Sequence, residues 1–495
     1  MENTALKRAT ILKEKLHNND DIIVREIRVG DKFCSLIFLD GLVDIEAINL
    51  SIIKTLINFE NLKNSEINLE EIQIKMNSVA GVEIIKDYEI VSKLLKGFAI
   101  LFLDGEEDSI AFNVVLYSSR SIEEPPTSMV IKGPREGFNE SIKINVSLVR
   151  KRLLTEDLKI ESFEVGVKTK TQVKVAYLVS IADSGIVKEI RKKIRKINID
   201  GIIDSYYLSK FLEDRPNSIF RQVGVTEKPD ICVAKMLEGR VAIFVDGSPI
   251  VLTVPYLFME DLQSSNDYYS DAHRVSLLRF IRLFGIISSV ILPGFFIALQ
   301  LFHYKVLPLK FLVTIINTTQ NLPLNPFLEI LFIMILFEIL FEASIRMPKY
   351  LGVAISIVGA LILGDTAVKA GLVSPPGVMI VAIPAISGYC VPDQNNQIFL
   401  LRAIFAVIGG IFGFQGLVLS GMFLICYMTK LDSFKTPFLA PLSPYVANDQ
   451  KDFVFKQVIT EMKTRPESFP EKNSIRLSNE NDKERKAWKE FHQDN

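Results

Sequence analysis

Residues 283–302, LFGIISSVILPGFFIALQLF, form an unbroken run of 20 residues without a charged side chain. A helix that rises about 1.5 Å per residue would cover about 30 Å over that length, which is the thickness of the hydrocarbon core of a bilayer. Two further charge-free runs cover 370–392 and 403–429. The chain is therefore expected to be a membrane protein.

The membrane half can be divided by its apolar runs. Five hydrophobic segments can be drawn, at 283–302, 326–345, 350–368, 373–392 and 403–429. A shorter apolar run, 306–318, is broken by Pro308 and Lys310. That run is too short to span a bilayer, so it suits an interfacial or re-entrant helix.

The region before the first apolar run, residues 1–277, is dense in charged residues and is typical of a globular α/β fold. Residues 1–20 are polar and charged, which is not the pattern of a secretory leader. Arg274, Arg279 and Arg282 precede the first run, so the positive-inside rule places the charged region in the cytosol. The tail is expected on the same side because it carries Lys430, Lys435, Lys451 and Lys456. Both ends inside require an even number of crossings, and the sequence leaves open which of the segments does not cross.

A repeated pattern lies within the charged region. Residues 91–105, VSKLLKGFAILFLDG, align without a gap with 233–247, VAKMLEGRVAIFVDG, and seven of the 15 positions are identical. The offset is 142, and LIFLD at 36–40 resembles VSIAD at 179–183 at an offset of 143. Each of these shorter segments is interpreted as an apolar strand that ends at an aspartate and precedes an amphipathic run. The near-equal offsets predict two copies of one α/β unit.

Each copy should end in a helix and a hairpin. Gly97 and Gly239 suit the left-handed position after a helix, and the Asp-Gly pairs that follow favour tight hairpin turns. The alternative is that the two Asp-Gly pairs are ordinary hairpin turns that are alike by chance.

Between the copies, residues 120–153 begin with proline-rich sequence and continue, from Ser141 to Leu154, as a basic amphipathic helix. A turn with two charges precedes this helix and is a candidate interdomain motif, although such a turn is more often a structural linker than a binding site. Its residues are Gly133, Pro134, Arg135, Glu136, Gly137 and Phe138.

Charges within the apolar segments are informative because they are costly in lipid. Glu338 and Glu342 are four residues apart and share a helical face, and Glu342 can pair with Arg346. Asp365 and Lys369 have the same spacing in the next segment. These residues are candidates either for internal pairing near the interface or for an ion pathway or gating contact.

The third segment carries a narrow stripe of small and polar residues with one leucine. Its members step by three or four and share one helical face: Gly352, Ser356, Gly359, Leu363 and Thr366. Such a stripe suits close helix packing or the wall of a narrow pore with a hydrophobic constriction. These five residues are the pore-lining candidates.

Several functions are disfavoured by what the sequence contains. The 57 basic and 58 acidic residues nearly balance, so nothing argues for nucleic acid as a partner. None of the four histidines has a second ligand at metal spacing, and the four cysteines show no paired spacing. Phosphate-binding and nucleophile motifs are also missing, so we expect no enzyme activity, no metal and no cofactor.

Four longer segments together resemble the A subunit of GerA-type spore germinant receptors. They are GPREGFNE at 133–140, VTEKPDICVAKMLEGRVAIFVDGSPIVLTVPYLF at 225–258, EILFEASIRMP at 338–348 and ISIVGALILGDTAVKAGLVSP at 355–375. The resemblance runs from about 119 to 460. This chain has Asp365 where members of the family often carry a small or uncharged polar residue.

The resemblance implies a protein of the spore inner membrane that works with an integral-membrane B subunit, which binds nutrients, and a lipoprotein C subunit. It also implies a homo-oligomer, most simply a pentamer, that forms a nutrient-gated cation channel and triggers germination. One alternative is a paralogous A-type protein that amplifies germination beside the dipicolinic-acid channel. Another is a solute transporter, but transporters usually show inverted repeats in the membrane half, whereas this repeat lies in the soluble half.

The expected fold class is an α/β soluble region of two like-folded subdomains followed by an all-α multi-spanning membrane domain. The expected division is a first cytosolic subdomain at 1–119, a linker with the GPREGF motif at 120–160, a second cytosolic subdomain at 161–277, the transmembrane helices at 278–430 and a cytosolic tail at 431–495.

Overall fold

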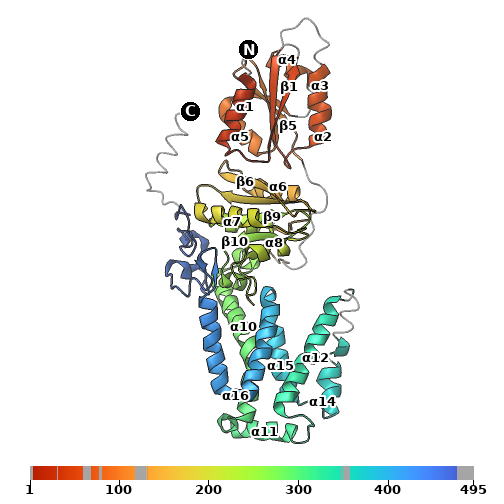
Figure 1. Ribbon diagram of the computed structural model, residues 1–495, viewed down its shortest axis with the longest axis vertical. Helices are drawn as coiled ribbons and strands as arrows, with labels where there is room; N and C mark the ends of the chain where they lie inside the picture. Colours follow the sequence, from red (N-terminus) through yellow and green to blue (C-terminus); the bar gives the residue numbers. More distant parts are fainter. Residues whose placement is uncertain are drawn as a thin grey trace.

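The computed structural model describes residues 4–29, 32–58, 68–76, 81–116, 130, 132–346, 348, 357–359 and 361–476. The molecule is elongated: two α/β units lie one above the other, and a group of helices extends from the second unit (Figure 1). We call residues 4–116 the first unit and residues 142–254 the second unit.

The first unit is a five-stranded antiparallel sheet with helices on both faces. Its strands are ordered β1-β2-β4-β5-β3. The strands are β1 (Ile22–Val29), β2 (Lys32–Leu39), β3 (Val82–Ile85), β4 (Phe98–Leu103) and β5 (Ser109–Asn113). The helices are α1 (Thr4–Lys15), α2 (Ile45–Ala47), η1 (Ile48–Ile53), α3 (Lys54–Asn58), α4 (Leu69–Lys75) and α5 (Asp87–Leu95).

Strand β2 shows why this sheet is covered on both sides. Leu36 and Phe38 pack with the helices between 45 and 75, whereas Ile37 and Leu39 pack with α1 and α5. Successive side chains of a strand point to opposite faces, so a strand covered on both faces is apolar throughout.

The second unit has the same architecture, with strand order β6-β7-β9-β10-β8. The strands are β6 (Leu158–Val165), β7 (Thr171–Leu178), β8 (Gly224–Thr226), β9 (Val241–Val245) and β10 (Val251–Val254). The helices are α6 (Ile142–Arg152), α7 (Ser184–Lys196), α8 (Ser205–Leu212) and α9 (Pro229–Leu237). Helices α6 and α9 cover one face and α7 and α8 the other. The prediction of two like-folded subdomains is confirmed, and α6 corresponds to α1.

The glycines after the paired helices have the predicted backbone conformation. Gly97 follows α5 with a φ of 90°, and Gly239 follows α9 with a φ of 95°. Each Asp-Gly pair also lies in a tight turn, because the Glu106 amide donates to the Leu103 carbonyl and the Ser248 amide to the Val245 carbonyl. The hairpins β4–β5 and β9–β10 as a whole are closed by five-residue loops, 104–108 and 246–250.

The second sequence echo was misaligned. Residues 179–183 do not form a strand, because β7 ends at Leu178 and a turn follows. Asp183 caps α7 by accepting hydrogen bonds from two backbone amides, and Asp44, not Asp40, does the same for α2. An aspartate with a free oxygen satisfies amides of the first helical turn, which explains why both units keep one there. The correct offset at this point is 139 residues.

A buried ion pair joins the two units. Arg150 of α6 donates from Nε and Nη2 to the two carboxylate oxygens of Asp21, at 2.6 and 2.9 Å. The side chains are 3% and 0% exposed. Beside them, Asn19 Oδ1 accepts from the Ile160 amide at 2.6 Å, and Asn19 Nδ2 donates to the Leu158 carbonyl at 2.8 Å. The first unit is thus fastened to the edge strand β6 by directional bonds.

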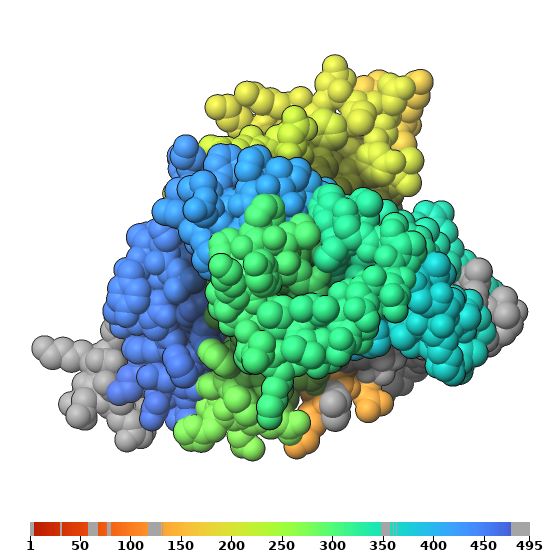
Figure 2. Space-filling view, turned by 90° about the horizontal axis from the view of Figure 1, so that it is seen from below, coloured from red at the N-terminus to blue at the C-terminus, as the bar shows by residue number. Residues whose placement is uncertain are grey.

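The helical half begins with α10 (Ala272–Leu301), which follows the second unit after two short 3-10 helices, η3 (Phe258–Leu262) and η4 (Ser265–Tyr269). It continues with α11 (Leu309–Thr319), α12 (Pro326–Arg346), η6 (Ile362–Thr366), α14 (Ala367–Lys369), α15 (Pro375–Gly388) and α16 (Asn395–Thr429). Two stretches of the described chain, Ala272–Leu301 and Pro392–Thr429, are long and apolar enough to cross a membrane. The short run predicted at 306–318 forms α11, which lies across the end of the bundle (Figures 1 and 2).

Helix α16 is not one straight rod, although the run 403–429 was drawn as one segment. Gly413 is non-helical, with φ 63° and ψ −151°. Just before α16, Gln394 Nε2 lies 3.4 Å from Tyr256 Oη, and near its other end Tyr427 Oη donates to Ser218 Oγ at 2.9 Å. A straight helix of this length would hold its ends about 50 Å apart. The chain therefore turns back at Gly413, and both ends of α16 lie beside the second unit or the residues that directly follow it.

Candidate functional site

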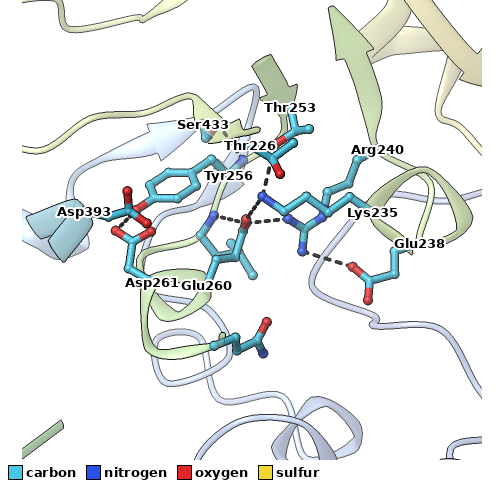
Figure 3. A network of polar contacts seen from close by, with 12 residues as sticks. Thr226, Lys235, Glu238, Arg240, Thr253, Tyr256, Glu260, Asp261, Asp393 and Ser433 are labelled. Carbon is cyan, nitrogen blue, oxygen red and sulfur yellow. Dashed lines mark hydrogen bonds and ion pairs between the residues drawn. The ribbon is translucent and has the colours of Figure 1, made fainter. Parts of the chain in front are cut away.

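A network of polar contacts lies at the junction between the second unit and the membrane helices (Figure 3). Figure 3 shows that Glu260 and Asp261, neighbours in η3 (Phe258–Leu262), point to two different groups of partners. Because η3 lies between strand β10 and helix α10, both groups sit on the direct path from the sheet to the membrane.

The Asp261 group reaches η7 (Pro392–Gln394), the short 3-10 helix before α16. Tyr256 Oη donates to Asp261 at 2.5 Å, and Arg221 and Gln394 also donate to this carboxylate. Arg221 lies 3.6 Å from Asp393 as well. Burial raises the pKa of Asp261, and the charge of Arg221 offsets this only in part. This group fixes the second unit to residues 393–394, which lead directly into α16.

The Glu260 group binds the sheet side of the junction. Arg240 lies 2.6 Å and Lys235 2.9 Å from the two oxygens of Glu260, and Arg240 also lies 3.1 Å from Glu238. Burial would raise the pKa of Glu260, but the charges of Arg240 and Lys235 outweigh it and lower the pKa. Burial also raises the pKa of Glu238. Glu260 is therefore held as a buried carboxylate by two cations.

A third group surrounds the start of α10. Arg279 is fully buried and binds Asp267 at 3.1 Å and Asp452 of the tail at 2.8 Å. Arg282 binds Asp267 at 2.7 Å, and Tyr268 donates to Asp452 at 2.9 Å. The sequence had assigned these arginines only a topological role. Asp452 could not be found from the sequence because it lies far away along the chain, and no helical spacing linked Asp267 to the two arginines.

The GPREGF motif lies beside this junction. Pro134 offers its carbonyl to Lys228 at 2.8 Å, and Glu136 pairs with Arg152 of α6 at 2.5 Å. Phe138 is buried and packs edge-on against Phe244, with ring centroids 5.9 Å apart. Gly137 is buried, and Arg135 is exposed.

Gly133 explains why this turn needs a glycine. Its φ is 112°, and a Cβ there would lie 2.6 Å from the ring of Tyr269, which stands just before α10. The motif therefore contacts both the second unit and the segment that enters the membrane helices.

The candidates in the membrane half are placed apart from one another. Glu342 pairs with Arg346 at 2.5 Å, and Asp365 pairs with Lys369 at 2.8 Å. Glu338 instead lines a cavity between α12, α15 and α16, together with Arg402.

The stripe residues are only partly visible. Gly352 and Ser356 lie outside the described residues, as does the side chain of Leu363. Gly359 is buried, and a Cβ there would lie 2.8 Å from Leu340 Cδ1 of α12, whereas Thr366 is exposed. Among the described residues, Gly359 is thus a packing contact, whereas Thr366 is exposed.

The described residues contain no group of three or more His, Cys, Asp and Glu side chains able to hold a metal ion. The three junction groups consist of buried ion pairs and hydrogen bonds that join the second unit, the tail and the residues that lead into α10 and α16. This arrangement suits the mechanical coupling of a soluble region to membrane helices.

Comparisons with known proteins agree on the class. The family described as Bacillus/Clostridium GerA spore germination protein matches residues 10–468. Spore germination protein KA of Bacillus subtilis (strain 168) is 34% identical over 470 residues, which cover 94% of this chain and 86% of that protein. Spore germination protein GerLA of Bacillus cereus is 31% identical over 468 residues, which cover 94% of this chain and 95% of that protein.

Among solved structures, the N-terminal domain of the A subunit of the Bacillus megaterium spore germinant receptor GerK3 is 32% identical to this chain. It matches with a TM-score of 0.42, over 52% of this chain and 97% of that domain.

The chain is a membrane protein with an α/β soluble region coupled to helices. It belongs to the GerA family of spore germination proteins, as the resemblance implied, and is a receptor A subunit of that family. The description of the family refers to spore germination and names no chemical reaction.

Proposed function

We propose that this chain is the A subunit of a nutrient-responsive germinant receptor and that several copies, most simply five, form a cation channel. The channel would lie in the spore inner membrane and act with a nutrient-binding B subunit and a lipoprotein C subunit. Domain limits of 1–119, 120–160, 161–277, 278–430 and 431–495 belong to the same proposal.

One observation carries the channel proposal. Thr366 is exposed, and so are both members of the Asp365–Lys369 pair, with 51% and 75% of their side chains uncovered. This segment lies at the edge of the helical half in a single chain (Figures 1 and 2). Charged groups facing lipid are costly, so another copy or an aqueous path should cover them.

We also propose that both termini lie in the cytosol. Contacts of the C-terminal tail support its placement on the same side of the membrane as the second unit. Asp452 binds Arg279, and the Lys472 amide donates to the Ile181 carbonyl of the second unit at 2.9 Å. The tail and the second unit must then occupy one compartment. Labelling of an N-terminal cysteine from outside the membrane would contradict the cytosolic assignment.

Assembly is tested by native mass spectrometry of the full chain in detergent. A single chain has too few helices to enclose a wide aqueous path, so a closed ring of five copies is expected. A strictly monomeric species that still conducts ions would end the proposal.

The gate is tested at Leu363, the one leucine of the stripe. A narrow ring of leucines around an axis disfavours water and ions, so Leu363→Ala should wet the ring and allow potassium efflux without nutrient. If Leu363 only packs helices together, the same change lowers the abundance of the subunit without a leak. Potassium efflux and protein level are therefore measured together, and normal abundance without efflux removes Leu363 from the gate.

A further inference from the structure

The exposed side of α10 becomes apolar before the charge-free run of the sequence begins. Leu277, Phe280 and Ile281 are exposed, and Phe284 continues the same surface inside the run. These residues are separated by three or four positions, so they lie on one side of the helix. From Leu277 to Leu283 the helix rises by about 9 Å, so the apolar surface starts that far outside the span that the sequence indicates.

The C-terminal tail extends this surface. The Lys456 amide donates to Ser276 Oγ at 2.9 Å, and Ser276 lies one turn before Phe280 on the same side of α10. The side chain of Lys456 is buried and donates to the Asp267 carbonyl, whereas its neighbour Phe455 is 75% exposed. The exposed apolar side chains of this part of the tail are Phe455, Val458 and Ile459.

The other side of α10 carries charges at the same height. Arg279 is the neighbour of Phe280 in the chain, but it is fully buried and binds Asp267 and Asp452. Successive residues of a helix rise by only about 1.5 Å. The ion pairs of Arg279 therefore lie level with the exposed apolar side chains.

The position of this surface indicates what covers it. It is continuous with the side chains that α10 exposes along its span, among them Ile287 and Ile291, and α10 contains no acidic residue. At its other end, Arg274 is exposed one turn before Leu277 and suits the phosphate of a lipid headgroup. A surface that is apolar towards the bilayer and ends at a cation matches the change from acyl chains to headgroups.

We propose that residues 277–281 of α10 and residues 455–459 of the tail lie in the headgroup layer of the leaflet next to the second unit, with their apolar side chains against the outermost part of the acyl chains. The ion pairs of Arg279 then lie below the lipid surface, on the protein side of α10. This contact with lipid would fix the depth of the junction in the membrane. The proposal does not depend on the number of copies or on ion conduction.

Depth-dependent fluorescence quenching of the full chain in nanodiscs tests this placement. The fluorophore NBD is attached to single cysteines in a chain whose exposed Cys390 and Cys426 are changed to serine. Phe455→Cys places the label on the proposed surface and Ile291→Cys places it within the span. Tyr88→Cys, at a position that is 79% exposed, places it on the first unit, which lies farthest from the helices (Figure 1).

The lipids carry a nitroxide quencher either near the headgroup or at the end of an acyl chain. A group about 5–10 Å inside the headgroup boundary should be quenched about twofold more by the shallow nitroxide than by the deep one, and this is expected for Phe455→Cys. The Ile291→Cys label should show the opposite order, which also demonstrates that the helices are inserted. Neither nitroxide should quench the Tyr88→Cys label.

Two results would overturn the proposal. If the Phe455→Cys label is as little quenched as the Tyr88→Cys label and emits as in water, the tail lies outside the membrane. If its emission is shifted to the blue but neither nitroxide quenches it, protein from a second copy or another subunit covers the surface. Phe280→Cys tests the helix independently of the tail, and it should also be quenched more by the shallow nitroxide.

Discussion

The first and second units share one fold but differ in what lies at equivalent positions. At the offset of 142, Phe98 of the first unit corresponds to Arg240 of the second, and Lys93 corresponds to Lys235. Lys93 pairs with Glu83 of its own sheet, where both side chains are partly exposed, at 23% and 53%. Lys235 and Arg240 instead bind Glu260, which lies outside the sheet at the membrane junction. The same backbone position thus makes a contact within the sheet in the first unit and a contact with the membrane junction in the second unit.

The units also differ in which segment pairs with the residues that follow the second strand of each sheet. In the first unit, Val115 bridges Val43, and the Leu116 amide donates to the Leu42 carbonyl at 2.8 Å. In the second unit, the corresponding Ala182 bridges Glu471, a residue of the C-terminal tail. The tail therefore takes the place that a local segment takes in the first copy. The two units therefore share one fold, but positions that make contacts within the first unit make contacts with the junction and the tail in the second unit.

The largest expected effect breaks the junction. Arg240→Phe introduces the residue that the first unit has at the equivalent position, Phe98. It also removes one positive charge from the buried carboxylates of Glu260 and Glu238. Removing one partner of a buried pair costs about 3–5 kcal/mol. Hydrogen exchange of β9 and β10 in the full chain measures this loss.

The matched control for that change lies in the first unit. Lys93→Met breaks an exposed pair at the equivalent position, and it should cost only about 0–1 kcal/mol. Equal losses in the two units would mean that the junction charges do not stabilise the second unit more than a surface pair does.

A smaller effect tests a feature that the copies share. Asp104 Oδ1 accepts from the Ala5 amide at 2.8 Å, and Asp246 Oδ1 accepts from the Ile142 amide at 3.2 Å. The aspartate of each Asp-Gly pair therefore caps the first helix of its own unit.

Asp104→Ala and Asp246→Ala should each cost about 1 kcal/mol, as for other lost helix caps. Asn at either position keeps the acceptor oxygen and should restore most of the loss. Exchange of the first-turn amides of α1 and α6 reports the effect, and an unchanged α6 in Asp246→Ala would show that only the first copy depends on its cap.

Local repeated patterns could be predicted from the sequence, whereas contacts between residues far apart in the sequence could not. The duplication, Gly97, Gly239 and the membrane half followed from short patterns with known physical causes. The echo at 36–40 failed because the spacing between Asp44 and Asp104 differs from that between Asp183 and Asp246 by three residues, so the wrong aspartate gave the more similar offset.

The junction could not be predicted in the same way. Arg240, Lys235 and Tyr256 all lie within the segment 225–258 that carried the family resemblance, yet nothing local indicates their partners. Asp393 and Asp452 lie far along the chain, and only the folded arrangement brings them to Arg221 and Arg279.

The last expected effect concerns the tail. Glu471 stands where the first unit has Val115, so an ionisable group occupies an apolar position. Burial raises its pKa to about 7, and the charge of Arg465 compensates only in part. Its Oε2 is buried without a hydrogen-bond partner. The docked tail therefore favours the protonated carboxyl.

The sign of the pH dependence follows from this raised pKa. Below the ordinary pKa of about 4.5, Glu471 is protonated whether or not the tail is docked, so docking is strongest there. As pH rises towards 7, the free tail ionises first and docking weakens; above 7 the loss is complete. Hydrogen-exchange protection of the Lys472 amide should fall over this range, whereas the Leu116 amide of the first unit should not respond. Glu471→Gln should remove the difference between the two amides, and a pH response that persists in this variant would assign it to another group.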